Sequence, residues 1–244
     1  CGFESHSRLM WNKEVTRKSL FAVAVASFLS LADAAMAWPK GSISSLPKSS
    51  TRRVAWTVDD GASSAALGRY VKMLEKNPSV KITFFVLSGA PGWTKYAARL
   101  KALQDSGQIQ LANHTATHRK LTKLSEARII AELNKCENFC LAKYGMSTKP
   151  YFRPPYGEID ARVIRVAASI GFTKPMLWYG SFASGSGVAS STVLKSASKW
   201  IANGRIVIDH ANGYCTTNVF PQIIQIFRSR KLKLVTLREA IDPQ

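Results

Sequence analysis

Short apolar stretches alternate with longer segments of helical spacing along most of the chain. The apolar stretches, which predict buried strands, lie at residues 54–58, 80–87, 109–112, 151–153, 175–178, 206–209 and 232–235. The segments between them space apolar residues as on one face of a helix, at residues 64–76, 93–106, 125–144, 160–170, 191–202 and 218–230. Strands that alternate with helices of ten or more residues indicate parallel β-α units. The pattern therefore predicts an α/β fold with a closed or nearly closed barrel.

Polar residues follow several predicted strands directly. Asp59-Asp60, Asn113-His114, Arg153 and His210 each lie at or just beyond a strand end. In β/α barrels the catalytic residues lie at the carboxyl ends of the strands. The sequence therefore predicts that these residues belong to one site.

Two histidines stand four residues apart in the segment His114-Thr115-Ala116-Thr117-His118. On a helix or a tight helical turn, residues four apart share a face, so both imidazoles could reach one cation. Thr115 stands where the helical metalloprotease motif needs a glutamate, which excludes that motif. The alternative is a pair of polar residues in a surface turn. A metal site here needs a further ligand and a base from elsewhere in the chain.

The adjacent Asp59 and Asp60 can supply both. Neighbouring carboxylates at a strand end can point in different directions, so one can bind a metal while the other stays free to accept a proton. Asp60, His114 and His118 together would leave coordination positions open for water and substrate, as in catalytic metal sites. An ordinary Asp-Gly turn is the alternative for this segment.

Four segments of the chain occur together in an order that is typical of one enzyme family. They are Thr57-Val58-Asp59-Asp60-Gly61, His114-Thr115-Ala116-Thr117-His118, Arg153-Pro154-Pro155-Tyr156 and Ile208-Asp209-His210. Through them the chain resembles the polysaccharide deacetylases of the NodB-homology family, or carbohydrate esterase family 4, across residues 52–244. The resemblance implies a distorted (β/α)7-type barrel. It also implies a metal-dependent hydrolase that removes N-acetyl groups from an N-acetylated polysaccharide or oligosaccharide and releases acetate.

The resemblance also assigns roles by position. Asp59 would be the general base, and Asp60, His114 and His118 would bind a divalent metal. Zinc suits one carboxylate and two histidines, although this ligand set does not exclude cobalt, nickel, manganese or iron.

The remaining matched residues would complete the catalytic machinery. Arg153 would orient the base, the backbone N–H of Tyr156 would hold the oxyanion, and His210 would protonate the departing amine. Trp178, Ile208 and Pro155 would line the substrate site. Taken singly, Arg153 could instead be a surface cation, His210 a structural histidine and Tyr156 a packing residue.

The chain departs from the family in the fourth motif, where aspartates usually accompany a tryptophan. Trp178 is present, but residues 161–208 contain no Asp or Glu. Asp209 is a poor substitute, because on a strand it should face away from His210. We expect an active enzyme with a less tightly tuned acid.

The amino-terminal region reads as an export signal. After Met10 come three basic residues, the apolar stretch 20–31 and the small residues Ala35 and Ala37, which together match a signal peptide. A helix that stays attached as an anchor is the alternative. We therefore expect residues 1–9 to be an upstream extension or a remnant of expression, 10–37 a signal peptide, 38–52 a Ser/Pro-rich linker and 53–244 the deacetylase domain.

Charge is the compositional outlier. Residues 38–244 hold thirty Lys and Arg against twelve Asp and Glu. Such an excess of positive charge attracts polyanions, which for an exported protein would be anionic cell-wall polymers or an anionic membrane face. The alternative is that the charge only confers solubility. The basic residues are scattered, so we expect no specific nucleic-acid partner, and no interior apolar run is long enough to predict a stable membrane span.

Cys136, Cys140 and Cys215 could all be buried thiols, or two of them could form a disulfide. A disulfide between Cys136 and Cys140, four residues apart on a predicted helix, would be strained.

The sequence is compatible with three functions. The first is an N-deacetylase of peptidoglycan or a chitin-like polymer that is secreted, periplasmic or cell-wall associated. The second is a carbohydrate- or cell-wall-binding pseudoenzyme on the same fold, and the third is a basic binding protein without turnover. Because acetylated xylan would place the same acetyl group over the same metal, the sequence does not name the sugar.

Overall fold

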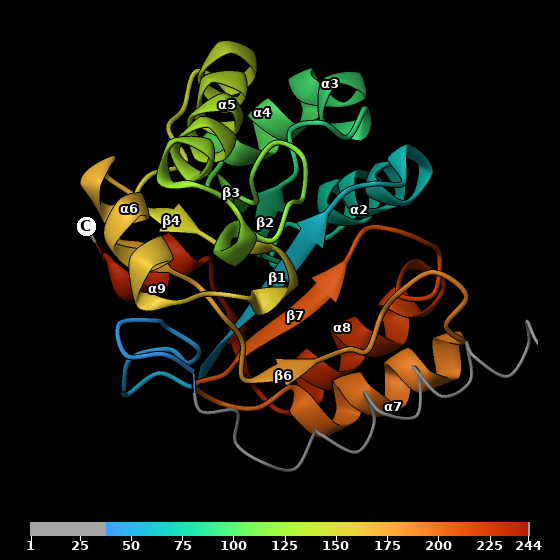
Figure 1. Cartoon of the computed structure of the whole chain (residues 1–244). Helices are drawn as coiled ribbons and strands as arrows, with labels where there is room; N and C mark the ends of the chain where they lie inside the picture. The colour runs from blue at the N-terminus through green and yellow to red at the C-terminus, as the bar shows by residue number, and fades with distance from the viewer. Residues whose placement is uncertain (1–37, 244) are drawn as a thin grey trace, which may run out of the picture. The chain divides into compact units, whose positions relative to one another are not determined.

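The structure is a computed structural model that describes residues 38–243. A parallel sheet forms the centre of the protein (Figure 1). Its strands follow the order β5-β4-β3-β2-β1-β7-β6, and β8 pairs with the start of β1. Their bounds are β1 Arg53–Asp60, β2 Ile82–Val86, β3 Ile109–Asn113, β4 Tyr151–Phe152, β5 Lys174–Pro175, β6 Gly180–Ser181, β7 Ile206–His210 and β8 Lys233–Leu234. The curled, parallel sheet confirms the predicted distorted barrel. The predicted upstream extension and signal peptide lie outside the described residues.

Helices surround the sheet (Figure 1). They are α2 Ser64–Lys76, α3 Gly92–Lys95, α4 Ala97–Asp105, α5 Glu126–Tyr144, α6 Ala161–Ser169, α7 Ser190–Trp200, α8 Phe220–Ser229 and α9 Leu237–Ile241. Short 3₁₀ turns lie at Leu121–Lys123, Pro155–Gly157 and Thr217–Val219. Ser125 caps the start of α5 by accepting from Arg128 N–H, and Gly145 ends the helix in the left-handed conformation.

Three local predictions are wrong. The helix expected at 93–106 divides at Tyr96, because a ψ of 18° at this residue breaks the helical path between α3 and α4. The strand expected at 175–178 is replaced by two short strands, β5 and β6. Helix α9 is missing from the prediction, because five residues are too few to show helical spacing.

Alternation along β1 decides which residues reach the site. Val54, Trp56 and Val58 face outward into the large core beneath the helices, whereas Ala55 packs in a second core inside the sheet's curve. Asp59 therefore shares the inner face with Ala55. At the strand ends of this face, Asp59 of β1 and Ile208 and His210 of β7 are left to form the site.

Residues 38–52, predicted to be a linker, contact the barrel at several points. Ile43 forms a β-bridge with Met176, Ser45 forms one with Arg205, and Leu46 is buried in the inner core. Trp38 Nε1–H donates to the carbonyl oxygen of Trp178 at 3.1 Å. Within residues 38–243, no helix is both long enough and apolar enough to cross a membrane.

Candidate active site

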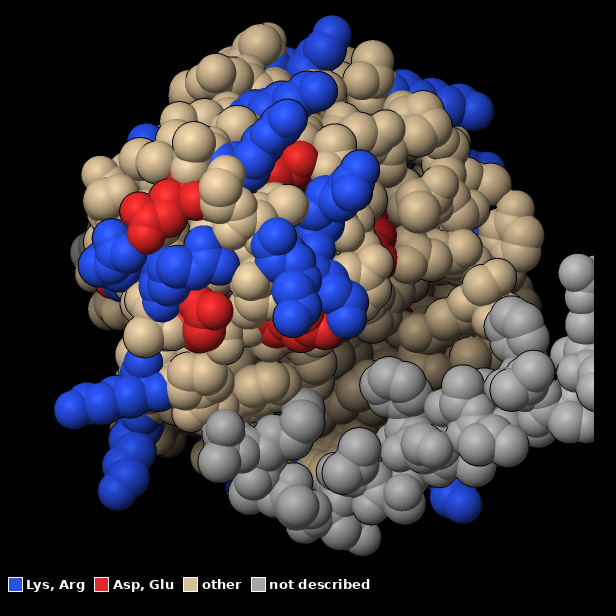
Figure 2. All heavy atoms as spheres, viewed as in Figure 1, with Lys and Arg blue, Asp and Glu red and all other residues tan. Residues whose placement is uncertain are grey.

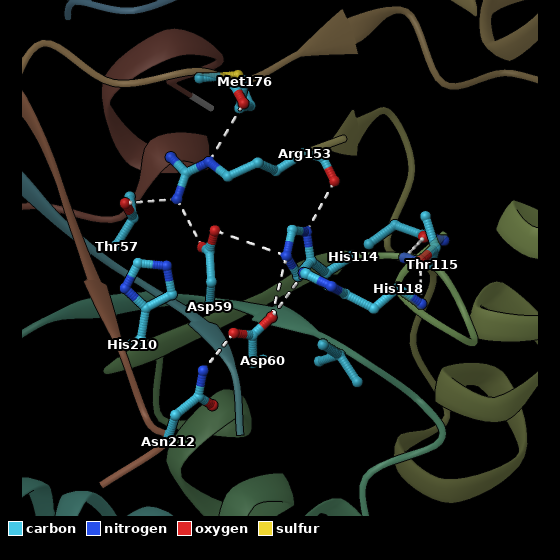
Figure 3. A network of polar contacts seen from close by, with 12 residues as sticks. Thr57, Asp59, Asp60, His114, Thr115, His118, Arg153, Met176, His210 and Asn212 are labelled. Atoms are coloured by element: carbon cyan, nitrogen blue, oxygen red, sulfur yellow. Dashed lines mark hydrogen bonds and ion pairs between the residues drawn. The ribbon is translucent and has the colours of Figure 1, made fainter. Parts of the chain in front are cut away.

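The two carboxylates at the end of β1 point in different directions. Asp59 Oδ1 accepts from Arg153 Nη1 at 2.6 Å, whereas Asp60 Oδ1 lies 3.2 Å from Nε2 of both His114 and His118 (Figure 3). The divergence arises at Asp60, whose φ of 70° lies in the left-handed region. A non-glycine residue is rarely found there and needs support from its surroundings.

The two histidines converge through a loop and not through a helical turn. The segment that joins them has no helical structure, and Thr115 and His118 have φ values of 69° and 58°. The helical geometry considered from the sequence is therefore wrong. The loop is held from α5 by Glu132, whose carboxylate accepts from the N–H groups of Ala116 at 3.0 Å and Thr117 at 2.8 Å.

Asp60, His114 and His118 form a group that fits a metal ion. Their ligand atoms all lie within 4.8 Å of one another. Three ligands about 2.0–2.1 Å from a tetrahedral zinc ion would lie roughly 3.3 Å apart, close to the 3.2 Å between Asp60 Oδ1 and each Nε2. Among the described residues, buried Asp60 Oδ1 receives no well-formed hydrogen bond. A cation at this point would supply the missing partner.

Neighbouring groups orient these ligands. Asn212 Nδ2–H donates to Asp60 Oδ2 at 2.5 Å, which leaves Oδ1 for the two imidazoles. His114 Nδ1 lies 2.8 Å from the carbonyl oxygen of Arg153. A carbonyl can only accept, so Nδ1 carries a hydrogen and Nε2 offers its lone pair when the ring is neutral.

The charges of this group depend on one another. Burial raises the pKa of Asp60, but the contacts with His114 and His118 outweigh it and hold this pKa far below its usual range. Burial lowers the pKa of His114, and the nearby Asp59 and Asp60 more than offset this, so its pKa lies above its usual value. Protons on the imidazoles and a bound cation would therefore compete for the same carboxylate.

Arg153 lies behind the cavity and is completely buried. Its guanidinium donates to Asp59, to Thr57 Oγ1 at 2.9 Å, and to the carbonyl oxygens of Met176 at 3.2 Å and Leu177 at 3.0 Å. Burial lowers the pKa of Arg153, an effect that Asp59 opposes; arginine stays protonated in proteins. Arg153 is therefore a fixed counter-charge to Asp59 and not a surface cation.

A cavity of about 260 Å³ opens over these groups. It is lined by Asp59, Asp60, His114, His118, Tyr156, Gly157, Trp178, Ser184, Ile208, His210 and Asn212. The structure thus brings most of the predicted site residues to one cavity. Pro155 is buried and does not line it.

The Tyr156 segment forms one wall of the cavity. Tyr156 has a φ of 62°, is 59% exposed, and stacks edge-on against His118 with ring centroids 4.6 Å apart. Its backbone N–H has no acceptor among the described residues. Gly157 follows with a φ of 68°, and a Cβ there would lie 2.7 Å from Trp178, so the close approach of the Trp178 ring depends on glycine.

Sequence reasoning missed Asn212, Glu132 and Ser184. Asn212 follows His210 by two residues, and its place after a strand end is the one signal that could have singled it out. Glu132 and Ser184 lie in a helix and in a Ser/Gly-rich loop, where nothing local marks them.

Asp209 faces away from His210, as alternation along the strand predicts. It is completely buried, and it accepts from Tyr70 Oη at 2.5 Å, Trp56 Nε1 at 3.2 Å and Thr216 Oγ1 at 2.7 Å. Burial and the neighbouring Asp209 raise the pKa of Tyr70 well above its usual value. Cys136, Cys140 and Cys215 are buried free thiols.

The chain matches the family model for polysaccharide deacetylase over residues 47–175, more than half of its length. It is 36% identical over 149 residues to chitin deacetylase 1 of Cryptococcus neoformans, a match that covers 60% of this chain and 28% of that protein. It is 26% identical over 188 residues to the peptidoglycan-N-acetylglucosamine deacetylase of Bacillus cereus, covering 75% of this chain and 66% of that one.

A solved structure shares the fold. It is a wild-type pseudoenzyme of carbohydrate esterase family 4 from Bacillus anthracis, with a TM-score of 0.71 and 21% identity over 82% of this chain and 69% of that one. At this identity the likeness concerns the fold.

Proposed function

The chain belongs to the polysaccharide deacetylase family, and we propose that it is a metal-dependent N-deacetylase of an N-acetylated polysaccharide or oligosaccharide. One observation carries the proposal. Asp60 Oδ1 and the two histidine Nε2 atoms converge at 3.2 Å beside Asp59, a second carboxylate that points elsewhere and is held by Arg153. This is the arrangement that metal-assisted hydrolysis needs, with a ligand set on one side and a separate base on the other.

We propose that Asp60, His114 and His118 hold the metal, and that the metal is zinc. When bound, a divalent cation supplies Lewis-acid polarisation of the acetamide carbonyl and lowers the pKa of water. Cobalt, nickel, manganese or iron would suit the same ligands. Exchange of the metal in the purified protein, followed by metal analysis and rate measurement, would identify it.

Asp59 is the proposed general base. Its Oδ1 is held by Arg153, and its Oδ2 lies 3.7 Å from His114 Nε2, so the side chain has one defined position beside the metal ligands. From there it takes a proton from the attacking water. The oxygen of that water forms a bond with the acetyl carbon, and the negative charge gathers on the former carbonyl oxygen.

Other residues that line the cavity offer groups for the later steps. The N–H of Tyr156 has no acceptor within the described residues, and we assign it to the oxyanion. His210 pairs in register with Asp59 on the neighbouring strands β1 and β7, which places it beside the base. Its ring gives a proton to the amide nitrogen as the C–N bond breaks, so the sugar amine and acetate leave. Ile208 and Trp178 line the space for the acetyl group.

The substrate we propose is a polymer that contains N-acetylglucosamine, either peptidoglycan or chitin-like. The named functions of the two relatives support these two classes. Lys and Arg are spread over the face seen in Figure 2 and outnumber the acidic side chains there. We propose that this surface attracts anionic cell-wall polymers and that the protein is exported to the cell wall, the periplasm or the medium.

A carbohydrate-binding pseudoenzyme is the second candidate. The lack of Asp and Glu in residues 161–208 favours it, because no carboxylate from this segment can partner His210. The metal set and the separately held base oppose it.

Acetate release tests the function. The purified protein would be stripped of metal, reloaded with zinc and incubated with N-acetylglucosamine oligomers, peptidoglycan and acetylated xylan. We expect zinc-dependent release, reduced by about 10² to 10⁴-fold in Asp59→Asn. Asp105→Asn is the matched control, since Asp105 is exposed on α4 and pairs with Lys101. Zinc binding without release from any substrate would support the pseudoenzyme.

A further inference from the structure

Ser184 stands beside His210 at the position where residues 161–208 provide no carboxylate. Its Oγ lies 3.2 Å from His210 Nδ1, and it also accepts from the backbone N–H of His210 at 3.0 Å. We propose that Ser184 is a positioning residue that holds the His210 imidazole in its working orientation. The proposal deepens the proposed function, since it concerns the residue assigned there as the acid.

Hydrogen-bond counting shows which directions these contacts can take. A serine hydroxyl has one hydrogen to donate and two lone pairs. One lone pair accepts from the His210 N–H, and the hydroxyl hydrogen is free to donate to Nδ1. Donation to Nδ1 places the ring hydrogen of the neutral imidazole on Nε2, on the edge that faces Asp59 (Figure 3). A second proton, bound at Nδ1, makes the ring an imidazolium and turns the hydroxyl into the acceptor. This imidazolium can give its Nε2 proton to the amide nitrogen and remains as a neutral ring with its hydrogen on Nδ1.

A hydroxyl differs from a carboxylate in this position. A carboxylate can only accept, so it would place the hydrogen of a neutral ring on Nδ1. A hydroxyl can rotate to donate to a bare Nδ1 or to accept from Nδ1–H. Ser184 can therefore donate to Nδ1 of the resting neutral ring and accept from Nδ1–H both before and after the imidazolium loses its Nε2 proton, without adding a charge.

The segment that leads into Ser184 is held in place. Phe182 is completely buried in the outer core, and its N–H donates to the carbonyl oxygen of Ile208 at 2.9 Å. Ala183 follows with a φ of 53°, and its N–H donates to Ser181 Oγ at 3.0 Å. This left-handed residue turns the chain so that Ser184 lines the cavity.

The backbone of His210 has a second acceptor. Its N–H also donates to Asp209 Oδ1 at 2.8 Å. The ring has no hydrogen-bond partner other than Ser184 among residues 38–243. Removing the Ser184 hydroxyl should therefore release the ring while the backbone of β7 stays in place.

Two pairs of variants test this role. Ser184→Ala removes the hydroxyl, and Ser186→Ala is the control, an exposed serine in the same loop. Ser184→Thr and Ser184→Val have nearly the same shape, but only Thr keeps a hydroxyl. If the loop accommodates neither Thr nor Val at residue 184, kcat falls in both of these variants. The comparison of Ser184→Ala with Ser186→Ala then tests the role of the hydroxyl.

We expect kcat to fall about tenfold to a hundredfold in Ser184→Ala and Ser184→Val, as when a reacting group loses its alignment. KM should stay within about twofold, because the hydroxyl is not assigned to substrate binding. Ser184→Thr and Ser186→Ala should stay close to the unaltered protein. Equal kcat in Ser184→Ala and Ser186→Ala would overturn the proposal.

Nitrogen NMR of the imidazole rings gives a readout that does not need turnover. In the zinc-loaded protein near neutral pH, we expect His210 Nδ1 to show the shift of a bare, hydrogen-bonded nitrogen. Ser184→Ala should move it towards the average of two tautomers. A His210 spectrum that does not change in Ser184→Ala would reject the role of Ser184. Lack of deacetylation by the unaltered protein, with the NMR change observed, would reject the proposed function alone.

Discussion

The carbonyl oxygen of Arg153 lies 2.8 Å from Nδ1 of His114, while the guanidinium of the same residue binds Asp59. One residue thus orients a metal ligand through its backbone and the proposed base through its side chain. The two functions can be separated by substitution, because a change of side chain leaves the carbonyl in place.

Arg153→Lys should impair the protein without destroying the metal site. Lysine lacks the planar fork that reaches Asp59, Thr57 and two carbonyl oxygens at once. Breaking a buried pair costs about 3–5 kcal/mol, so we expect a loss approaching this size in the free energy of unfolding, measured in urea. Zinc affinity of the folded variant should stay within about tenfold of the original, since the backbone carbonyl of residue 153 still accepts from His114 Nδ1.

Arg165→Lys is the control for this change. Its side chain is 65% exposed and pairs with Glu126 at the surface, so we expect a change below about 0.5 kcal/mol. An equal loss in the two variants, or loss of zinc binding in folded Arg153→Lys, would contradict the division of roles.

Zinc should stabilise the folded protein. A ligand that binds only the folded state at a hundred times its Kd adds about 2.7 kcal/mol, so the Tm of metal-stripped protein should rise when zinc is added. Magnesium at the same concentration should have little effect, because it prefers oxygen ligands. His118→Ala should abolish the zinc shift. A shift of the original size in His118→Ala would place the metal elsewhere.

Glu132→Gln tests whether the histidine loop is held from α5. The carboxylate accepts from two backbone N–H groups and, at 2.6 Å, from Thr117 Oγ1. An amide has one acceptor oxygen in place of two, so part of this network must break. We expect zinc affinity, measured by competition with a chelator, to fall about 10- to 100-fold. Glu126→Gln, at the exposed start of the same helix, should leave the affinity unchanged; equal affinities in both variants would rule out this support.

The order of elements was predictable because burial imposes periodicity. Strand β1 and helix α5 have enough residues to show it, whereas β6 and α9 do not. That the Asp209 side chain points away from His210 was also predictable, because neighbouring residues of a strand alternate between its two faces.

The site was predictable only in part. Asp59, Asp60 and the two histidines could be named because polar residues stand at strand ends in recognisable motifs. The left-handed residues Thr115 and His118 carry no local signal, since non-glycine residues adopt this conformation only when tertiary contacts hold them. Ser184 was unpredictable for a related reason, because a serine in a Ser/Gly-rich loop acquires its partner only when β6 pairs with β7.

An ion-pair cluster at the base of the barrel should make the stability of the protein depend on pH. Glu239 on α9 lies 2.8 Å from Lys81 Nζ and 3.2 Å from Lys233 Nζ. Burial raises the pKa of Glu239, but the two lysines outweigh it and lower this pKa below its ordinary value of 4.5. The folded state therefore binds this proton less readily than the unfolded state does. The stabilisation is present above about pH 4.5 and is lost as the pH falls through the folded-state pKa.

Glu239→Gln removes this contribution. Partly exposed pairs contribute about 0.2–1 kcal/mol each, so the variant should be less stable than the original by about 1 kcal/mol at pH 7. The difference should shrink as the pH falls below 4.5, because protonation then neutralises Glu239 in the original protein as well. Urea unfolding of both proteins at pH 7 and pH 3.5 measures it, with Glu126→Gln as the matched control on a more exposed pair. A difference that stays constant with pH would mean that Glu239 stabilises α9 through contacts that do not depend on its charge.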